Sequence, residues 1–247
     1  MNSESYREPD GKQSKGTLEP TVLFLSGHSV LDEAATSTPL YQVNCDITSI
    51  SNKDSSLVFE RVDHKVPELE LEDVDVTAGT SRKRPIFYLA HPMNAQYRTD
   101  IPARYYITAA LPEMVGNIRL DTSGTRFHKV SFKAMLSSGK TASHQPLFDE
   151  VTQQLLFDIQ PQWKLGRSCY KWSDCVGKQL AVEEHMGDIY KLSITTHLEQ
   201  SLRDALVAVW LLRLWHDTAE SKQAKKECES SRAPLSPICY SILWPLP

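Results

Sequence analysis

The segment Ala205-Leu206-Val207-Ala208-Val209-Trp210-Leu211-Leu212 is a run of eight apolar residues near the end of the chain. In a helix such a run covers every face rather than one stripe. Thr196 and Glu199 have the spacing of a capping box, which predicts a helix over residues 198–215. The apolar run is far shorter than the ~20 residues needed to span a bilayer. The sequence therefore predicts a helix that protein surrounds on all sides.

The rest of the chain has the pattern of antiparallel strands. Short segments that alternate apolar and polar residues are separated by turn signals such as Asp121-Thr122-Ser123-Gly124. These segments cover residues 40–47, 57–62, 86–89, 105–110, 118–120, 127–135, 155–159, 179–183 and 190–194. A sheet closed on itself buries a helix from every direction. The predicted fold is mostly β, a closed antiparallel β-barrel of about twelve strands around one buried hydrophobic C-terminal α-helix.

Composition divides the chain into three parts. Residues 1–38 are rich in Ser, Thr, Glu, Gly and Lys, so we expect a disordered leader that contributes no core strand. Residues 39–217 form the expected barrel domain, within which the acidic stretch 67–84 is predicted to be an exposed insertion. Residues 218–247 are polar and then rich in proline, and we expect a disordered tail there.

Cysteine usage and the first residues indicate the compartment. Five cysteines at scattered spacings favour separate reduced thiols over a disulfide framework. The first 20 residues contain seven charged residues and no apolar run, which argues against a cleaved secretory signal. We expect a cytoplasmic protein that associates peripherally with membranes.

Charge is uneven along the chain, although the net charge is only -4. Residues 81–140 carry ten basic residues against three acidic ones, and residues 41–80 carry nine acidic against three basic. A shared basic face would attract phosphates or an anionic membrane surface. Outward strand positions neutralised by the acidic block explain the same charges without a ligand. The candidate lipid- or phosphate-binding residues are Arg98, Arg104, Arg119, Arg126, Lys129 and Lys133.

Motifs for metal, nucleotide and nucleic-acid binding are not found in the sequence. The eight histidines stand singly, without the paired spacing of a zinc site, so no metal is expected. With ten glycines there is no glycine-rich phosphate cradle, and we expect no cofactor. The negative net charge and the lack of a recognition motif argue against a nucleic-acid partner.

One cluster of titratable residues, Glu183-Glu184-His185, has the composition of a general acid and base pair. Alternation along a strand puts Glu183 and His185 on the same face. The end of a strand that enters the turn at Gly187 explains the same residues structurally. Glu183 and His185 are the candidate catalytic residues.

The order of these features resembles the tubby C-terminal-like superfamily, which includes tubby, LURP-one-related and phospholipid scramblase proteins, and in particular its small fungal members. The resembling parts are Leu40-Tyr41, an aromatic strand end with an Asp174-x-x-Gly177 turn before residues 179–183, the strand 190–194 and the helix 204–215. The resemblance covers residues 40–216 and implies a twelve-stranded barrel around a hydrophobic helix. It also implies lipid binding, although no individual lipid-binding residue aligns. The strand-like segment that closes tubby proper has no counterpart here.

Two kinds of function fit these expectations. The first is a non-enzymatic barrel module that associates with membrane lipid, of phosphoinositide type, or with a protein partner. The second is a non-redox cyclase or isomerase of fungal secondary metabolism that shapes an apolar small molecule in the barrel mouth. Binding to lipid vesicles would favour the barrel module. A gene that lies beside genes for a synthase and oxygenases would favour the cyclase or isomerase.

Trp210→Ala tests the buried helix directly. We expect the substitution to lower the free energy of unfolding by about 3–5 kcal/mol, because the other apolar residues of the run leave no helix face for solvent. Chemical denaturation measures this loss. A helix that lies on a membrane surface would behave differently, keeping its stability and losing affinity for vesicles.

Overall fold

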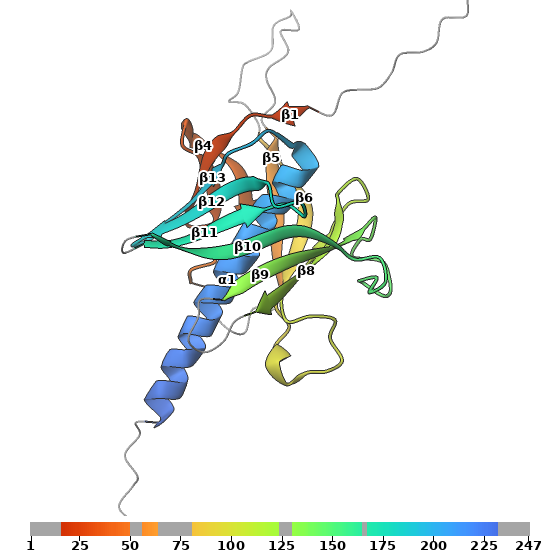
Figure 1. Cartoon of the computed structure of the whole chain (residues 1–247), viewed down its shortest axis with the longest axis vertical. Helices are drawn as coiled ribbons and strands as arrows, with labels where there is room; N and C mark the ends of the chain where they lie inside the picture. The colour runs from red at the N-terminus through yellow and green to blue at the C-terminus, as the bar shows by residue number, and fades with distance from the viewer. Residues whose placement is uncertain (1–15, 50–55, 64–80, 124–129, 165–166, 232–247) are drawn as a thin grey trace, which may run out of the picture.

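The computed structural model describes residues 16–49, 56–63, 81–123, 130–164 and 167–231 (Figure 1). Within these residues, twelve antiparallel strands form a closed barrel in the order β10-β11-β12-β13-β2-β3-β4-β5-β6-β7-β8-β9. The predicted fold class is confirmed. The barrel strands are β2 (Thr21–Ser26), β3 (Ser29–Asp32), β4 (Ala35–Val43), β5 (Ser56–Asp63), β6 (Arg82–Ala90), β7 (Tyr106–Ala109), β8 (Gly116–Ser123), β9 (Ser131–Ser138), β10 (Gln154–Lys164), β11 (Arg167–Ser173), β12 (Gln179–Met186) and β13 (Ile189–Ile194).

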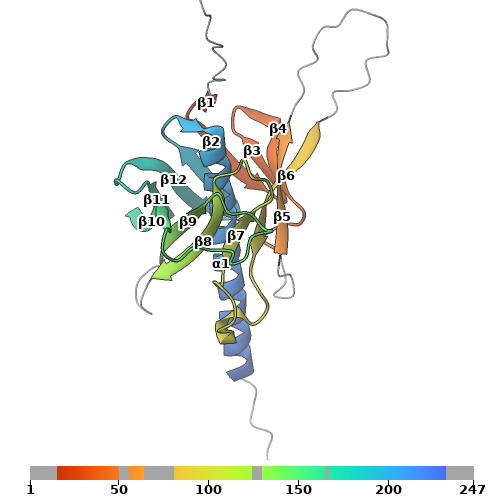
Figure 2. The ribbon, with the colours of Figure 1, turned by 90° about the vertical axis from the view of Figure 1, so that its right-hand side faces the viewer.

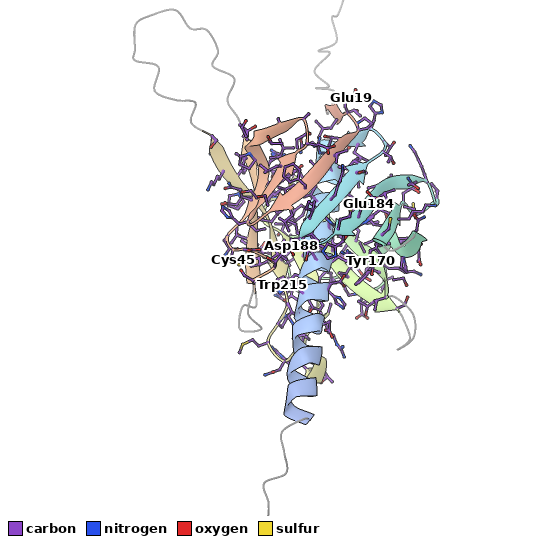
Figure 3. The ribbon with its side chains drawn as sticks, turned by 90° about the vertical axis from the view of Figure 1, so that its left-hand side faces the viewer. Glu19, Cys45, Tyr170, Glu184, Asp188 and Trp215 are labelled. Carbon is purple, nitrogen blue, oxygen red and sulfur yellow. The ribbon has the colours of Figure 1, made fainter. Side chains whose placement is uncertain are left out.

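Helix α1 (Gln200–Ser231) runs through the barrel and protrudes beyond it, as Figures 1 and 2 show. Each residue from Ala205 to Leu212 is fully buried. Trp215 lies near the level at which the helix leaves the side chains of the barrel (Figure 3). Side chains from opposite walls of the barrel therefore meet the helix rather than one another, and the helix is the centre of the core.

The observed helix bounds differ from the predicted ones at both ends. Leu198–Glu199 form strand β14, which pairs with β1 (Thr17–Leu18), so the helix begins at Gln200 and the capping box at Thr196 does not form. At the other end the helix continues to Ser231, through residues expected to be tail. Residues 218–231 contain Ala, Glu, Lys and Gln and no Pro or Gly, so they extend a helix that the core has already nucleated. The remaining expected tail, 232–247, lies outside the described residues.

The prediction of a disordered leader over residues 1–38 is wrong from residue 17 onward. Residues 17–38 contain β1, β2, β3 and the first part of β4, and β2 pairs with both β13 and β3. Leu23, Leu25 and Val30 are buried in the core. The polar composition of this part of the chain gave little indication of these short strands. The apolar segment Val22-Leu23-Phe24-Leu25 forms the middle of β2. Residues 1–15, and residues 67–80 of the expected insertion 67–84, lie outside the described part of the chain, whereas residues 82–84 of that insertion belong to strand β6.

Deletion of residues 1–34 is expected to abolish cooperative thermal unfolding, because it removes β2 and β3 and leaves β13 and β4 with unpaired edges. Circular dichroism during heating measures the transition. The matched control is deletion of residues 1–15, which keeps all the described strands and should unfold cooperatively. A cooperative transition in the longer deletion at the temperature of the full chain would contradict the closed barrel.

Candidate functional site

The candidate residue Glu183 belongs to a buried ionic cluster inside the barrel. It projects from β12 toward the helix, where Arg213 Nη2 donates to its Oε1, and Trp172 Nε1 donates to its Oε2 at 3.3 Å. Arg213 also donates to Asp217 Oδ2 at 2.7 Å, and its guanidinium lies 4.4 Å from the centroid of the Tyr170 ring. Burial raises the pKa of Glu183, and Arg213 opposes that shift. The cluster ties the helix to β11 and β12.

The second candidate, His185, has a different neighbour. Its ring stacks on Tyr190 with the centroids 4.2 Å apart, and its Nε2 is buried without a hydrogen-bond partner. Both candidates lie on the inner side of β12, as strand alternation predicts. The two candidates have separate partners, since Arg213 pairs with the carboxylate of Glu183 and Tyr190 stacks on the ring of His185.

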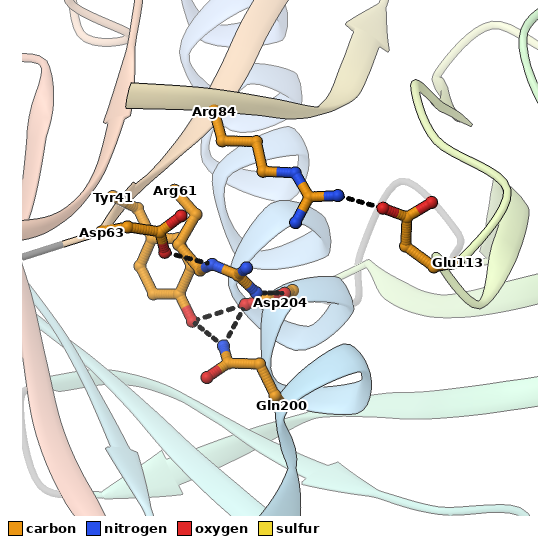
Figure 4. A network of polar contacts seen from close by, with 7 residues as sticks. All are labelled: Tyr41, Arg61, Asp63, Arg84, Glu113, Gln200 and Asp204. Atoms are coloured by element: carbon orange, nitrogen blue, oxygen red, sulfur yellow. Dashed lines mark hydrogen bonds and ion pairs between the residues drawn. The ribbon is translucent and has the colours of Figure 1, made fainter. Parts of the chain in front are cut away.

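A polar network surrounds the start of helix α1, at the end of the barrel that we call the N-terminal mouth (Figure 4). Asp204 is fully buried, and its Oδ1 accepts hydrogen bonds from the Tyr41 hydroxyl at 2.8 Å and from Gln200 Nε2 at 2.5 Å. Its Oδ2 accepts from Arg61 Nη1 at 3.0 Å, and Arg61 Nε donates to Asp63 at 3.0 Å. Burial raises the pKa of Asp204, and the bond from Tyr41 lowers it.

A cavity of about 430 Å³ opens beside this network. It is lined by Leu18 of β1, Leu40 and Tyr41 of β4, Arg61, Val62 and Asp63 of β5, and Gln200 and Arg203 of the helix. Arg203 is 8% exposed, and its Nε is buried without a hydrogen-bond partner. Across the described parts of the chain, no carboxylate forms an ion pair with Arg203, whereas Arg61 pairs with Asp63 and Asp204, and Arg84 pairs with Glu113.

The opposite end, where the helix leaves the barrel, is the C-terminal mouth. A cavity of about 330 Å³ lies there, lined in part by Arg104, Tyr105, Arg119, His216 and Glu220. The structure thus brings two of the predicted basic residues, Arg104 and Arg119, to one cavity. Arg119 Nε lies 2.9 Å from Asp121 Oδ1, which balances its charge.

An aromatic pair that includes the lining residue Tyr105 lies at the C-terminal mouth. The rings of His91 and Tyr105 stack with their centroids 4.1 Å apart, and Trp215 meets both rings edge to face. Burial raises the pKa of Tyr105 and lowers the pKa of His91. The stack anchors the last residues before β7 against the helix.

The other predicted basic residues do not join this cavity. Arg98 forms an ion pair with Asp100 and lines a separate surface cavity of about 820 Å³. Lys133 is exposed on β9, opposite Asp121 of β8 and Asp158 of β10. Arg126 and Lys129 lie outside the described residues.

The buried charged side chains of the helix were not predicted as part of a site. No role was predicted for Arg203, Asp204 or Arg213, whereas all three are buried. The available signal was Arg213, because Leu212, Leu214 and Trp215 surround it in the sequence and a charge buried among apolar residues requires a partner.

Comparison with protein-family models, with curated proteins and with solved structures finds no match for this chain. Within the described residues, no group of three or more His, Cys, Asp or Glu side chains is placed to hold a metal ion. The same part of the chain contains no helix with the length and apolarity required to cross a membrane.

Arg213→Met is expected to lower the free energy of unfolding by about 3–5 kcal/mol, because it leaves the carboxylate of Glu183 buried without its cation. Adding Glu183→Gln should restore much of the loss, because a neutral amide oxygen still accepts the Trp172 N–H and carries no charge. Urea denaturation of both variants and of Glu183→Gln alone measures the coupling. Strictly additive losses would show that the pair does not interact.

Proposed function

We propose that this chain is a non-enzymatic barrel module that associates with an anionic membrane surface through the loop between β6 and β7, residues 91–105. The observation that carries the proposal is the composition of the outer surface of this loop. Met93 is 52% exposed and Tyr97 is 79% exposed, and Arg98 and Arg104 lie in the same loop.

Exposed apolar side chains that are grouped and bordered by basic ones are typical of a membrane interaction site. An aromatic ring and a thioether enter the boundary between lipid headgroups and acyl chains, while neighbouring guanidinium groups reach the phosphates. Met93, Arg98 and Ile101 also line the 820 Å³ surface cavity, so the exposed side chains of the loop surround a hollow. The His91–Tyr105 stack joins the first and last residues of the loop, and both rings contact Trp215 of the helix, so the loop projects from a fixed base.

The fold supports membership of the tubby C-terminal-like superfamily, which we include in the proposal. A twelve-stranded barrel around a hydrophobic helix is what the resemblance in the sequence implies. Association with a lipid of phosphoinositide type follows from that membership, and Arg104 beside the cavity of the C-terminal mouth is the residue that we propose for the headgroup.

A binding role accounts for the interior better than catalysis does. The helix fills the barrel, and the Glu183 carboxylate is bound by Arg213 rather than presented to a substrate. For the cyclase or isomerase alternative, no feature of the described residues provides a specific supporting observation.

Vesicle sedimentation tests the proposal. The protein should sediment with phosphatidylcholine vesicles that contain phosphatidylserine or a phosphatidylinositol bisphosphate, less in high salt, and not with phosphatidylcholine alone. Met93→Ser combined with Tyr97→Ser should abolish binding. Arg104→Gln should weaken it about fivefold, because one basic residue at an anionic surface contributes about 1 kcal/mol.

Matched controls lie on the turn between β11 and β12. Val176 is 83% exposed, so Val176→Ser removes an exposed apolar side chain elsewhere on the barrel, and Lys178→Gln removes an exposed charge. Both variants should bind like the unchanged protein. Equal binding by the loop variants and the controls would contradict the assignment to the β6–β7 loop, and no binding to any vesicle would reject the lipid function.

A further inference from the structure

The N-terminal mouth presents a buried cation without a matching anion. Arg203 lies on the first turn of the helix, and its guanidinium borders the 430 Å³ cavity. Burial raises the pKa of the Tyr41 hydroxyl and the charge of Arg203 opposes that shift, which places the guanidinium near the hydroxyl. The carboxylate of Asp204 does not neutralise it, because Tyr41, Gln200 and Arg61 already occupy the oxygens of Asp204.

Burying a charge without a partner costs several kcal/mol, and folded proteins rarely retain such a group without a use. The neighbouring arginines illustrate the usual arrangement, since Arg61 has Asp63 and Asp204 and Arg84 has Glu113 (Figure 4). Arg203 differs from both, because no described carboxylate forms an ion pair with it and its Nε is buried beside the cavity without a hydrogen-bond partner. An anion bound in the cavity would provide the missing partner.

The cavity walls specify the rest of the ligand. Leu18, Leu40 and Val62 give it an apolar side, contributed by three different strands. Its volume lies in the range of about 300–1,000 Å³ that is usual for small-molecule sites. Arg203 and Gln200 stand on the helix side, so an anionic head and an apolar body would face opposite walls.

We propose that the N-terminal mouth is a binding site for a small amphipathic anion, whose carboxylate or phosphate pairs with Arg203 and whose apolar part packs against Leu18, Leu40 and Val62. This site does not depend on the membrane proposal. A helix rises about 1.5 Å per residue, so Arg203 lies about 20 Å from His216 at the C-terminal mouth.

The chain itself contains a second source of carboxylates. The acidic residues Glu68, Glu70 and Glu72 follow β5 in the sequence, and Asp63 at the end of β5 lines the cavity. A tethered segment competes at high effective concentration. The experiment therefore compares the unchanged chain with a Glu68→Gln, Glu70→Gln, Glu72→Gln variant.

Isothermal titration calorimetry with decanoate, decyl phosphate and the neutral control decanol, all below their micelle-forming concentrations, tests the proposal. We expect saturable binding of one anion per chain and much weaker binding of decanol. The two anions distinguish a carboxylate ligand from a phosphate ligand by their relative affinities. Arg203→Met should weaken binding about tenfold to a hundredfold, as loss of a charge-assisted hydrogen bond does. Lys178→Met is the matched control and should bind normally.

A stability measurement separates a ligand site from a structural arginine. Without ligand, Arg203→Met should unfold at the same temperature as the unchanged protein or higher, because it removes an uncompensated buried charge. Arg203→Gln provides a second variant with the same expectation. A lower unfolding temperature for both, equal affinity for decanol and decanoate, or no saturable binding would overturn the proposal. The proposal would also be overturned if the Glu68→Gln, Glu70→Gln, Glu72→Gln variant bound the anions and the unchanged protein did not. That result would assign the cavity to residues 68–72.

Discussion

Burial of a helix without a polar face is the constraint on which the rest of the structure depends. Trp210 and its neighbours are apolar in every direction around the helix, so packing against one sheet face would leave half of them in water. A closed sheet satisfies all directions at once and also removes the unpaired strand edges. The helix therefore fills the interior of this barrel. In a small barrel that has no central helix, side chains of the strands fill that space.

Charged residues of the helix lie where the barrel can satisfy them. Asp204, near the start of the helix, is held by Tyr41 and Arg61 from two adjacent strands. Arg213, further along, is held by Glu183 from the opposite part of the wall. These two contacts fix the rotation and the depth of a helix whose apolar surface alone has no preferred orientation. Arg203 is buried as well, but no described carboxylate forms an ion pair with it.

The sequence was informative wherever one local pattern determined the structure. The apolar run from Ala205 to Leu212 predicted the helix, its burial and hence the closed sheet. Strands β2 and β3 were missed because four apolar residues within a polar stretch are a weak local signal, and only their pairing with β13 makes them part of the wall. The polar sites were less predictable still. Tyr41 and Asp204 lie far apart in the chain, and no spacing rule relates them.

The position of β2 between β13 and β3 has a consequence for biosynthesis. The chain is made from its N-terminus, so β2 and β3 leave the ribosome long before β13, their distant neighbour in the wall. The helix that fills the core follows all twelve barrel strands. Until it emerges, the nascent strands have no common core to cover, and exposed apolar faces of this kind are prone to aggregation. Closure of the barrel also requires β2 to pair with β13, which lies far from it in the sequence, and such long-range contacts slow folding.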